Sequence, residues 1–121
     1  MRNEANEVVK PIMLTVEESG DEYTLEFSKE SVIFTNRQGF KISEFQDNME
    51  EMLPILWYGA FRMHHKNVSR QKTDKLLEDI GGLTSEAAER LIMLYGQPRK
   101  SLFRDEEEEP ENPPKANLKL L

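Results

Sequence analysis

The sequence has no cysteine among its 121 residues. A chain without thiols forms neither a disulfide framework nor a thiolate zinc site. No stretch approaches the roughly 18 uninterrupted apolar residues of a membrane-spanning helix, and the N-terminus lacks the basic and apolar segments of a signal peptide. We therefore expect a soluble, cytoplasmic protein.

The motifs of common catalytic sites are also missing. The sequence contains no Gly-x-Ser-x-Gly elbow, and Gly81 and Gly82 are not followed by the Lys-Ser/Thr pair of a phosphate-binding loop. Its two histidines, His64 and His65, are adjacent, and on a helix they would point about 100° apart, so they could not ligate one ion from the same face. We expect a protein that is not an enzyme and has no catalytic residue, metal or cofactor.

Basic residues are outnumbered by acidic ones, 16 to 23. The formal net charge is −7, and residues 104–121, with 6 acids and 3 bases, account for less than half of it. Nucleic acids and anionic membranes are bound mainly through basic side chains. The acidic body therefore predicts no nucleic acid and no membrane as a partner, although it allows one local basic patch.

The length predicts one domain, because domains cluster near about 100–150 residues. Residues 1–10 are polar and predicted to be flexible, and residues 11–103 form the single domain. Residues 104–121 carry four consecutive glutamates followed by three prolines, a composition that cannot bury a core. We expect a disordered acidic tail there.

The most apolar stretch, residues 49–65, contains the only tryptophan and predicts a central helix. Pro54 should break or kink it near Met52 and Leu53, so that Pro54 opens the main part of the helix. A helix that is apolar on two faces needs other elements on both. One predicted stripe comprises Met49, Met52, Leu53, Leu56, Ala60 and Met63, and Trp57 and Phe61 widen it.

The elements before this helix are predicted from alternation and capping. Apolar residues alternate in residues 12–16 and 23–27, which indicates a β-hairpin with Gly20 in its turn. Ser28 is the expected N-cap of a helix over residues 29–38 that ends at Gly39, with Val32, Ile33 and Asn36 on one side, although residues 32–35 would suit a strand equally well. Residues 43–46 match a capping box, which predicts another helix start.

The elements after the central helix have clear boundaries. Ser69 should cap a helix over residues 70–79 that Gly81 and Gly82 stop, with Leu76, Leu77 and Ile80 facing inward. Thr84 or Ser85 should cap the last helix, which continues to Tyr95. The predicted fold class is α+β, mainly α, with an N-terminal β-hairpin packed on a small bundle of about four helices and a disordered acidic C-terminal tail.

Residues 62–80 allow a DNA-binding interpretation. Arg62, Lys66, Arg70, Lys72 and Lys75 give five positive charges there, in the order helix, turn, helix that a helix-turn-helix regulator uses. The acids Asp74, Glu78 and Asp79 on the second helix count against this alternative. A small acidic inhibitor of a host enzyme is a third possibility.

Residues 11–97 contain the segment YGAFRMHH and, after it, Thr-Asp-Lys and Gly-Gly. Over this range, and most specifically in these segments, the chain resembles the small tail assembly chaperones of long-tailed, siphovirus-type phages and prophages of Gram-positive bacteria. The resemblance implies a mostly helical, oligomeric protein of the host cytoplasm that binds the tape-measure protein during tail assembly. It also implies a longer, frameshifted form of the chain and the major tail protein as further partners.

An apolar surface for a helical client would be drawn from Met and aromatic side chains. For each of these residues, packing in the core is the alternative role. The predicted partner-binding residues are Met52, Trp57, Tyr58, Phe61, Met63 and Tyr95.

Overall fold

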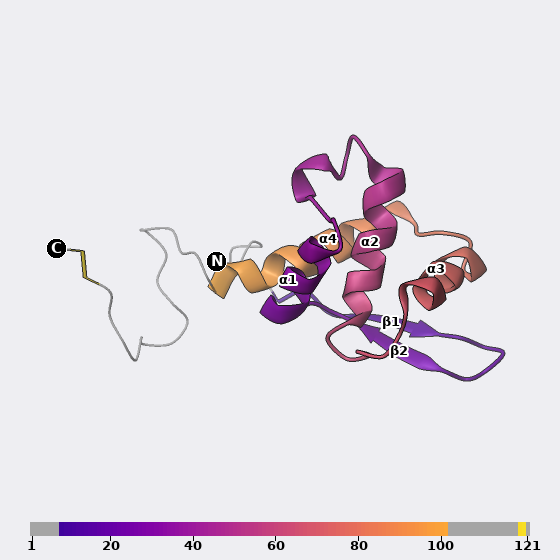
Figure 1. Cartoon of the computed structure of the whole chain (residues 1–121). Helices are drawn as coiled ribbons and strands as arrows, with labels where there is room; N and C mark the ends of the chain where they lie inside the picture. Colours follow the sequence, from indigo (N-terminus) through magenta and orange to yellow (C-terminus); the bar gives the residue numbers. More distant parts are fainter. Residues whose placement is uncertain (1–7, 102–118, 121) are drawn as a thin grey trace.

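The computed structural model describes residues 8–101 and 119–120 (Figure 1). An antiparallel hairpin comes first and four α-helices follow it, which confirms the predicted fold class, while the predicted tail falls almost wholly outside the described residues. Within the described part, no helix has the length and apolar character needed to cross a membrane. The elements are β1 (Ile12–Thr15), β2 (Glu22–Leu25), α1 (Lys29–Arg37), the 3-10 helix η2 (Ile42–Glu44), α2 (Met49–Phe61), α3 (Arg70–Asp79), α4 (Ser85–Gly96) and the 3-10 helix η3 (Gln97–Ser101).

The hairpin is attached to the end of α2 by its second strand. Ile12 pairs with Leu25 and Thr15 with Glu22, and Gly20 takes a φ of 76° in the turn, as predicted. The Glu26 N–H donates to the Ala60 carbonyl at 3.0 Å. A two-stranded sheet is marginal alone, so this edge contact and the buried Leu25 give it support.

Helix α2 is wrapped by the other elements. It contacts α1, α3, α4 and β2, and Figure 1 shows it between α1 and α3. Its two apolar faces are therefore covered, as the sequence predicted. The two ends of the predicted stripe are exceptions, because Met49 and Met63 remain exposed. The buried residues of α2 are Met52, Ile55, Leu56, Trp57, Gly59, Ala60 and Phe61.

Pro54 does not break α2. The helix begins at Met49 and continues through Pro54 to Phe61, so the predicted break and the predicted start at Pro54 are wrong. The missing N–H of Pro54 leaves the Glu50 carbonyl without its helical donor. Glu50 is exposed, so water can reach this end of the helix. Burial of the surrounding apolar residues outweighs the local cost.

The predicted capping box at residues 43–46 is also wrong. Ser43 lies inside η2, and α2 begins after Asn48, whose side chain makes no capping bond. The amide of Asn48 donates instead to Glu51 Oε2 at 3.1 Å. The ring of Phe45 packs against Phe40, with centroids 6.3 Å apart. This contact between residues five apart favours a turn over a helix that starts at Ser43.

The ends of α1 match the prediction. The Ser28 hydroxyl accepts from the Ser31 N–H at 3.1 Å, which caps the first turn. At the other end, Gly39 has a φ of 103°, and the Phe40 N–H donates to the Thr35 carbonyl. This bond is part of a Schellman motif, in which Gly39 supplies the left-handed residue.

The buried face of α1 carries small residues. Ser31 and Thr35 are buried, whereas Ile33 is 50% exposed and Asn36 is exposed. The side predicted to hold Val32, Ile33 and Asn36 is therefore mostly exposed, and Val32 alone of the three is partly buried. A Cβ added at Gly59 would overlap Thr35 Oγ1 and lie 2.7 Å from Thr35 Cβ. Helices α1 and α2 come so close here that only small side chains fit between them.

Helices α3 and α4 begin and end as predicted. The Ser69 hydroxyl accepts from the Lys72 N–H at 3.0 Å, and the Thr84 hydroxyl accepts from the Ala87 N–H at 3.1 Å. Leu76 is buried, but Ile80 is 43% exposed, so its predicted inward position is wrong. Ile80 is the C-cap of α3, beyond the last turn that packs on α2.

Candidate functional site

The pocket beside α1 is the first candidate site. It measures about 390 Å³ and lies between α1 and the residues that follow α2. Apolar side chains and cations line it together, and we call it the α1 pocket. Its lining residues are Ser28, Glu30, Ser31, Ile33, Phe34, Arg37, Gln38, Arg62, Met63 and Lys66.

Arg62 is held in place inside the α1 pocket. Its guanidinium carbon lies 4.4 Å from the centroid of the Phe34 ring, within range of a cation–π interaction. The same guanidinium donates to the Lys66 carbonyl at 3.2 Å. Phe34 in turn packs edge to face against Tyr58, with centroids 5.3 Å apart. A charged group therefore stands over an aromatic surface in a fixed orientation.

The α1 pocket is cationic in an acidic chain. Arg37, Arg62 and Lys66 line it, and Glu30 is the acid that lines it with them. Among the residues that the structure describes, none of these three cations takes part in an ion pair. A ligand that carries carboxylates beside apolar groups would match this surface in both charge and hydrophobicity.

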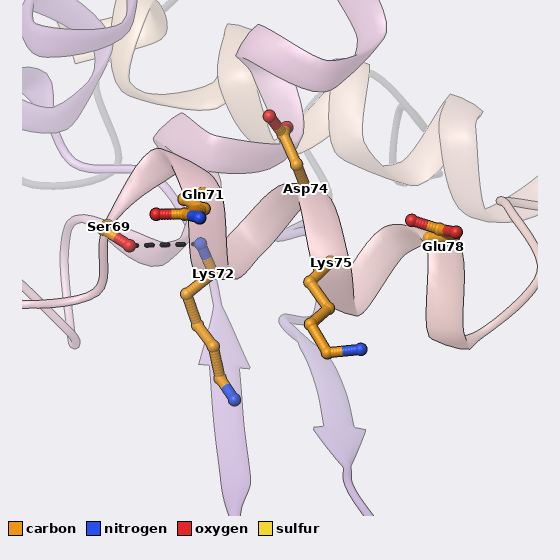
Figure 2. Close-up of a pocket in the computed structure, with 6 residues that line it drawn as sticks. All are labelled: Ser69, Gln71, Lys72, Asp74, Lys75 and Glu78. Carbon is orange, nitrogen blue, oxygen red and sulfur yellow. Dashed lines mark hydrogen bonds between the residues drawn. The ribbon is translucent and has the colours of Figure 1, made fainter.

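The outer surface of α3 is the second candidate site. A hollow of about 530 Å³ there is lined by Ser69, Gln71, Lys72, Asp74, Lys75 and Glu78, all from one helix and its cap. In Figure 2, Lys72 and Lys75 extend to the same side of α3 and Asp74 to the opposite side. These lining side chains include no large apolar residue, so the surface offers little to an apolar ligand.

The charges of α3 are largely neutralised within the helix. Arg70 Nε lies 2.9 Å from Asp74 Oδ1, and Lys75 Nζ lies 3.4 Å from Asp79 Oδ1. Residues 62–69 separate α2 from α3, a longer connection than the roughly 3–4-residue turn of a helix-turn-helix motif. Both observations weaken the DNA-binding interpretation of residues 62–80.

The residues predicted to bind a partner are divided between the core and the surface. Met52, Trp57 and Phe61 are part of the core, so a partner cannot reach them in this fold. Trp57 Nε1 donates instead to the Thr73 carbonyl at 2.8 Å, which attaches α3 to α2. Met63 is exposed and lines the α1 pocket.

Tyr58 and Tyr95 are partly buried. Tyr58 packs against the Phe34 ring but does not itself line the α1 pocket. The Tyr95 hydroxyl donates to Asn36 Oδ1 at 2.6 Å, so it joins α4 to α1. Burial raises the pKa of this hydroxyl above its ordinary value. Of the six predicted residues, Met63 alone belongs to the α1 pocket.

The two histidines contact the hairpin. His64 Nε2 lies 2.7 Å from Glu26 Oε1, and His65 Nε2 accepts from the Thr24 N–H at 2.9 Å. Burial, assisted by the nearby charge of His64, lowers the pKa of His65. Within the described part of the chain, no group of three His, Cys, Asp or Glu residues is placed to hold a metal ion.

The sequence interpretation missed Ile33, Phe34 and Arg37 as site residues. Arg37 and Arg62 are far apart in the chain and meet only because α1 packs against α2. One available signal was the cationic run that begins at Arg62. The alternative DNA-binding interpretation of residues 62–80 used this run. The structure divides that run between the α1 pocket and α3.

Comparison with known proteins identifies the family. The chain belongs to the family described as a domain of unknown function (DUF5055), whose model matches residues 5–118. Neither a curated protein nor a solved structure matches the chain.

Proposed function

We propose that this member of the DUF5055 family is a tail assembly chaperone of a long-tailed phage or prophage. In this role it acts without enzymatic chemistry and binds the tape-measure protein in the host cytoplasm while the tail is assembled. Two things support the proposal: the resemblance of residues 11–97 to such chaperones and the presence of a surface suited to a helical client.

The α1 pocket is the observation that carries the proposal. Ile33, Phe34 and Met63 provide apolar contact area, and the adjoining cations provide charge. An amphipathic helix binds a groove through apolar residues spaced three and four apart, and acids on its flank would meet the cations. The net charge of −7 keeps such a complex soluble.

The same proposal includes the assembly state. The resemblance to tail assembly chaperones implies several copies, so we propose a homo-oligomer in which each copy presents one α1 pocket. A longer, frameshifted form of the chain would carry the same pocket, because it would share residues 28–66. We propose the major tail protein as a further partner in this role.

Co-expression with the tape-measure protein tests the function. We expect the chain to raise the soluble yield of the tape-measure protein and to co-purify with it. The double variant Ile33→Glu and Met63→Glu should weaken this binding roughly 30-fold to 100-fold, because two large apolar contacts worth about 2–3 kcal/mol are lost.

A matched control introduces the same two glutamates at apolar residues that are similarly exposed but lie outside the α1 pocket. Ile80 and Met93 are 43% and 57% exposed and lie outside the α1 pocket. The double variant Ile80→Glu and Met93→Glu should co-purify like the native chain. An unchanged soluble yield and no co-purification of the native chain would refute the function. Equal losses in both double variants would refute the α1 pocket as its site.

A further inference from the structure

The acidic run of residues 105–109 is the complement of the α1 pocket. It consists of Asp105 followed by four glutamates, which are five consecutive negative charges. The α1 pocket has three cations without an ion pair among the described residues. Opposite charges attract at close range, and the attraction is stronger where apolar groups exclude water.

The length of chain after η3 allows the acidic run to reach the α1 pocket. Helix η3 packs against α1 and ends at Ser101, four residues before Asp105. An extended chain spans up to about 3.5 Å per residue, so residues 105–109 can reach roughly 14–28 Å from Ser101. This exceeds the diameter of a helix with its side chains, about 10–12 Å. The run can therefore pass around α1.

The connection also raises the local concentration of the acids. Two groups joined by a short linker meet at an effective concentration of the order of millimolar. Weak contacts between the acids and Arg37, Arg62 and Lys66 would then be occupied much of the time. An acidic segment of another molecule has no such advantage.

From these observations we propose that residues 105–109 bind the α1 pocket of the same chain. Bound there, the acids neutralise the pocket and compete with any other acidic ligand. The inference does not depend on the proposed function, because both partners are in this sequence.

A spin label on the C-terminal segment of the full chain tests the proposal. The sequence has no cysteine, so Asn112→Cys gives one labelling site three residues after the acidic run. We expect the label to broaden the amide NMR signals of residues 33–38 and 62–66 and to spare residues 70–79. Converting the five acids to the matching amides, by Asp105→Asn together with Glu→Gln at positions 106–109, should abolish the broadening.

Two charge-reversal variants separate the α1 pocket from general electrostatics. Arg37→Glu with Lys66→Glu should abolish the broadening, whereas Lys72→Glu with Arg90→Glu should keep it. The residues of both pairs are exposed, and the same NMR spectra show whether the fold persists. Raising the salt concentration from about 0.1 M to 1 M shortens the screening length from about 10 Å to 3 Å and should weaken the broadening.

Three outcomes would overturn the proposal. The first is equal broadening over α3 and the α1 pocket, and the second is broadening that survives Arg37→Glu with Lys66→Glu. The third is broadening between molecules, seen when a spin-labelled chain without isotope is mixed with an isotope-labelled chain without spin label. That third outcome would assign the pocket to the acidic run of a second copy.

Discussion

The two long faces of α1 have opposite characters. On the inner face, Ser31 and Thr35 are fully buried against α2, and on the outer face Ile33 and Arg37 are exposed. An ordinary amphipathic helix places its large apolar residues toward the core. In α1 the close approach of Thr35 to Gly59 leaves no room for them.

The two faces of α1 therefore have different roles in our proposal: the inner face contributes to stability and the outer face to binding. Small residues on the inner face determine where α1 sits, so large residues on the outer face are available for other contacts. The same separation continues past α2, where Met63 lines the α1 pocket and His65 holds the hairpin. Changes on the inner side should therefore affect folding, and changes on the outer side should affect binding.

Gly59→Ala should produce the largest effect. The added methyl group would overlap Thr35 Oγ1, so α1 must move away from α2. We expect a loss of about 3 kcal/mol or more in the free energy of unfolding, measured by urea denaturation. The double variant with Thr35→Ala removes the nearest atom and should recover part of the loss. Full stability of Gly59→Ala would contradict the close packing of the two helices.

Trp57→Phe tests the side of α2 that packs against α3. Phe fills less space and cannot donate to the Thr73 carbonyl, which the indole reaches at 2.8 Å. We expect a loss of about 2 kcal/mol from the missing volume and hydrogen bond together. Thermal unfolding followed by circular dichroism would measure it. A change below about 0.5 kcal/mol would show that α3 does not depend on this contact.

Acidification should release the hairpin and spare the α1 pocket. Protonation of His65 Nε2 removes its bond from the Thr24 N–H, and the pKa of His65 is lowered by folding. Because the unfolded chain then binds more protons, stability should fall as the pH drops below about 6.5 and through the lower folded value. The loss ends once the pH is below the folded value, because both states then carry the proton.

His65→Gln supplies the control for this pH dependence. The Gln carbonyl can accept from the Thr24 N–H but does not titrate between about pH 5 and 7. Both chains keep His64 and its contact with Glu26. Identical pH profiles of stability for the native chain and His65→Gln would contradict the role of His65.

Ile33→Glu should have the smallest effect on stability. Half of the Ile33 side chain is exposed, and a glutamate there can pair with Arg37 one turn later. We expect the free energy of unfolding to stay within about 0.5 kcal/mol of the native value. Urea denaturation of Ile33→Glu and of Gly59→Ala compares the free energies of unfolding of the two variants directly. A loss as large as that of Gly59→Ala would remove the distinction between the two faces.

Local signals predicted much of the fold. Ser28, Ser69 and Thr84 each cap a helix by bonding a backbone N–H three residues later, and glycines end α1 and α3. Such bonds depend on neighbours in the sequence, so a pattern can reveal them. The alternating residues of the hairpin are equally local.

Packing contacts that the local pattern does not show account for the errors. Ser43 matched a capping box, but the contact between Phe40 and Phe45 holds that segment as a turn. The inner face of α1 depends on Gly59, which no local pattern connects to Thr35. The α1 pocket was missed for the same reason, because Arg37 and Arg62 belong to different elements. The core was easier to predict, because burial follows the apolar period along α2.

Hydrogen exchange of the chain with and without co-expressed tape-measure protein tests the central claim most directly. The claim is that the outer face of α1, with the residues after α2, is the binding surface. It predicts slower exchange confined to residues 29–38 and 62–66 in the complex, with α3 unchanged. Slower exchange over residues 70–79 with none in α1 would contradict it.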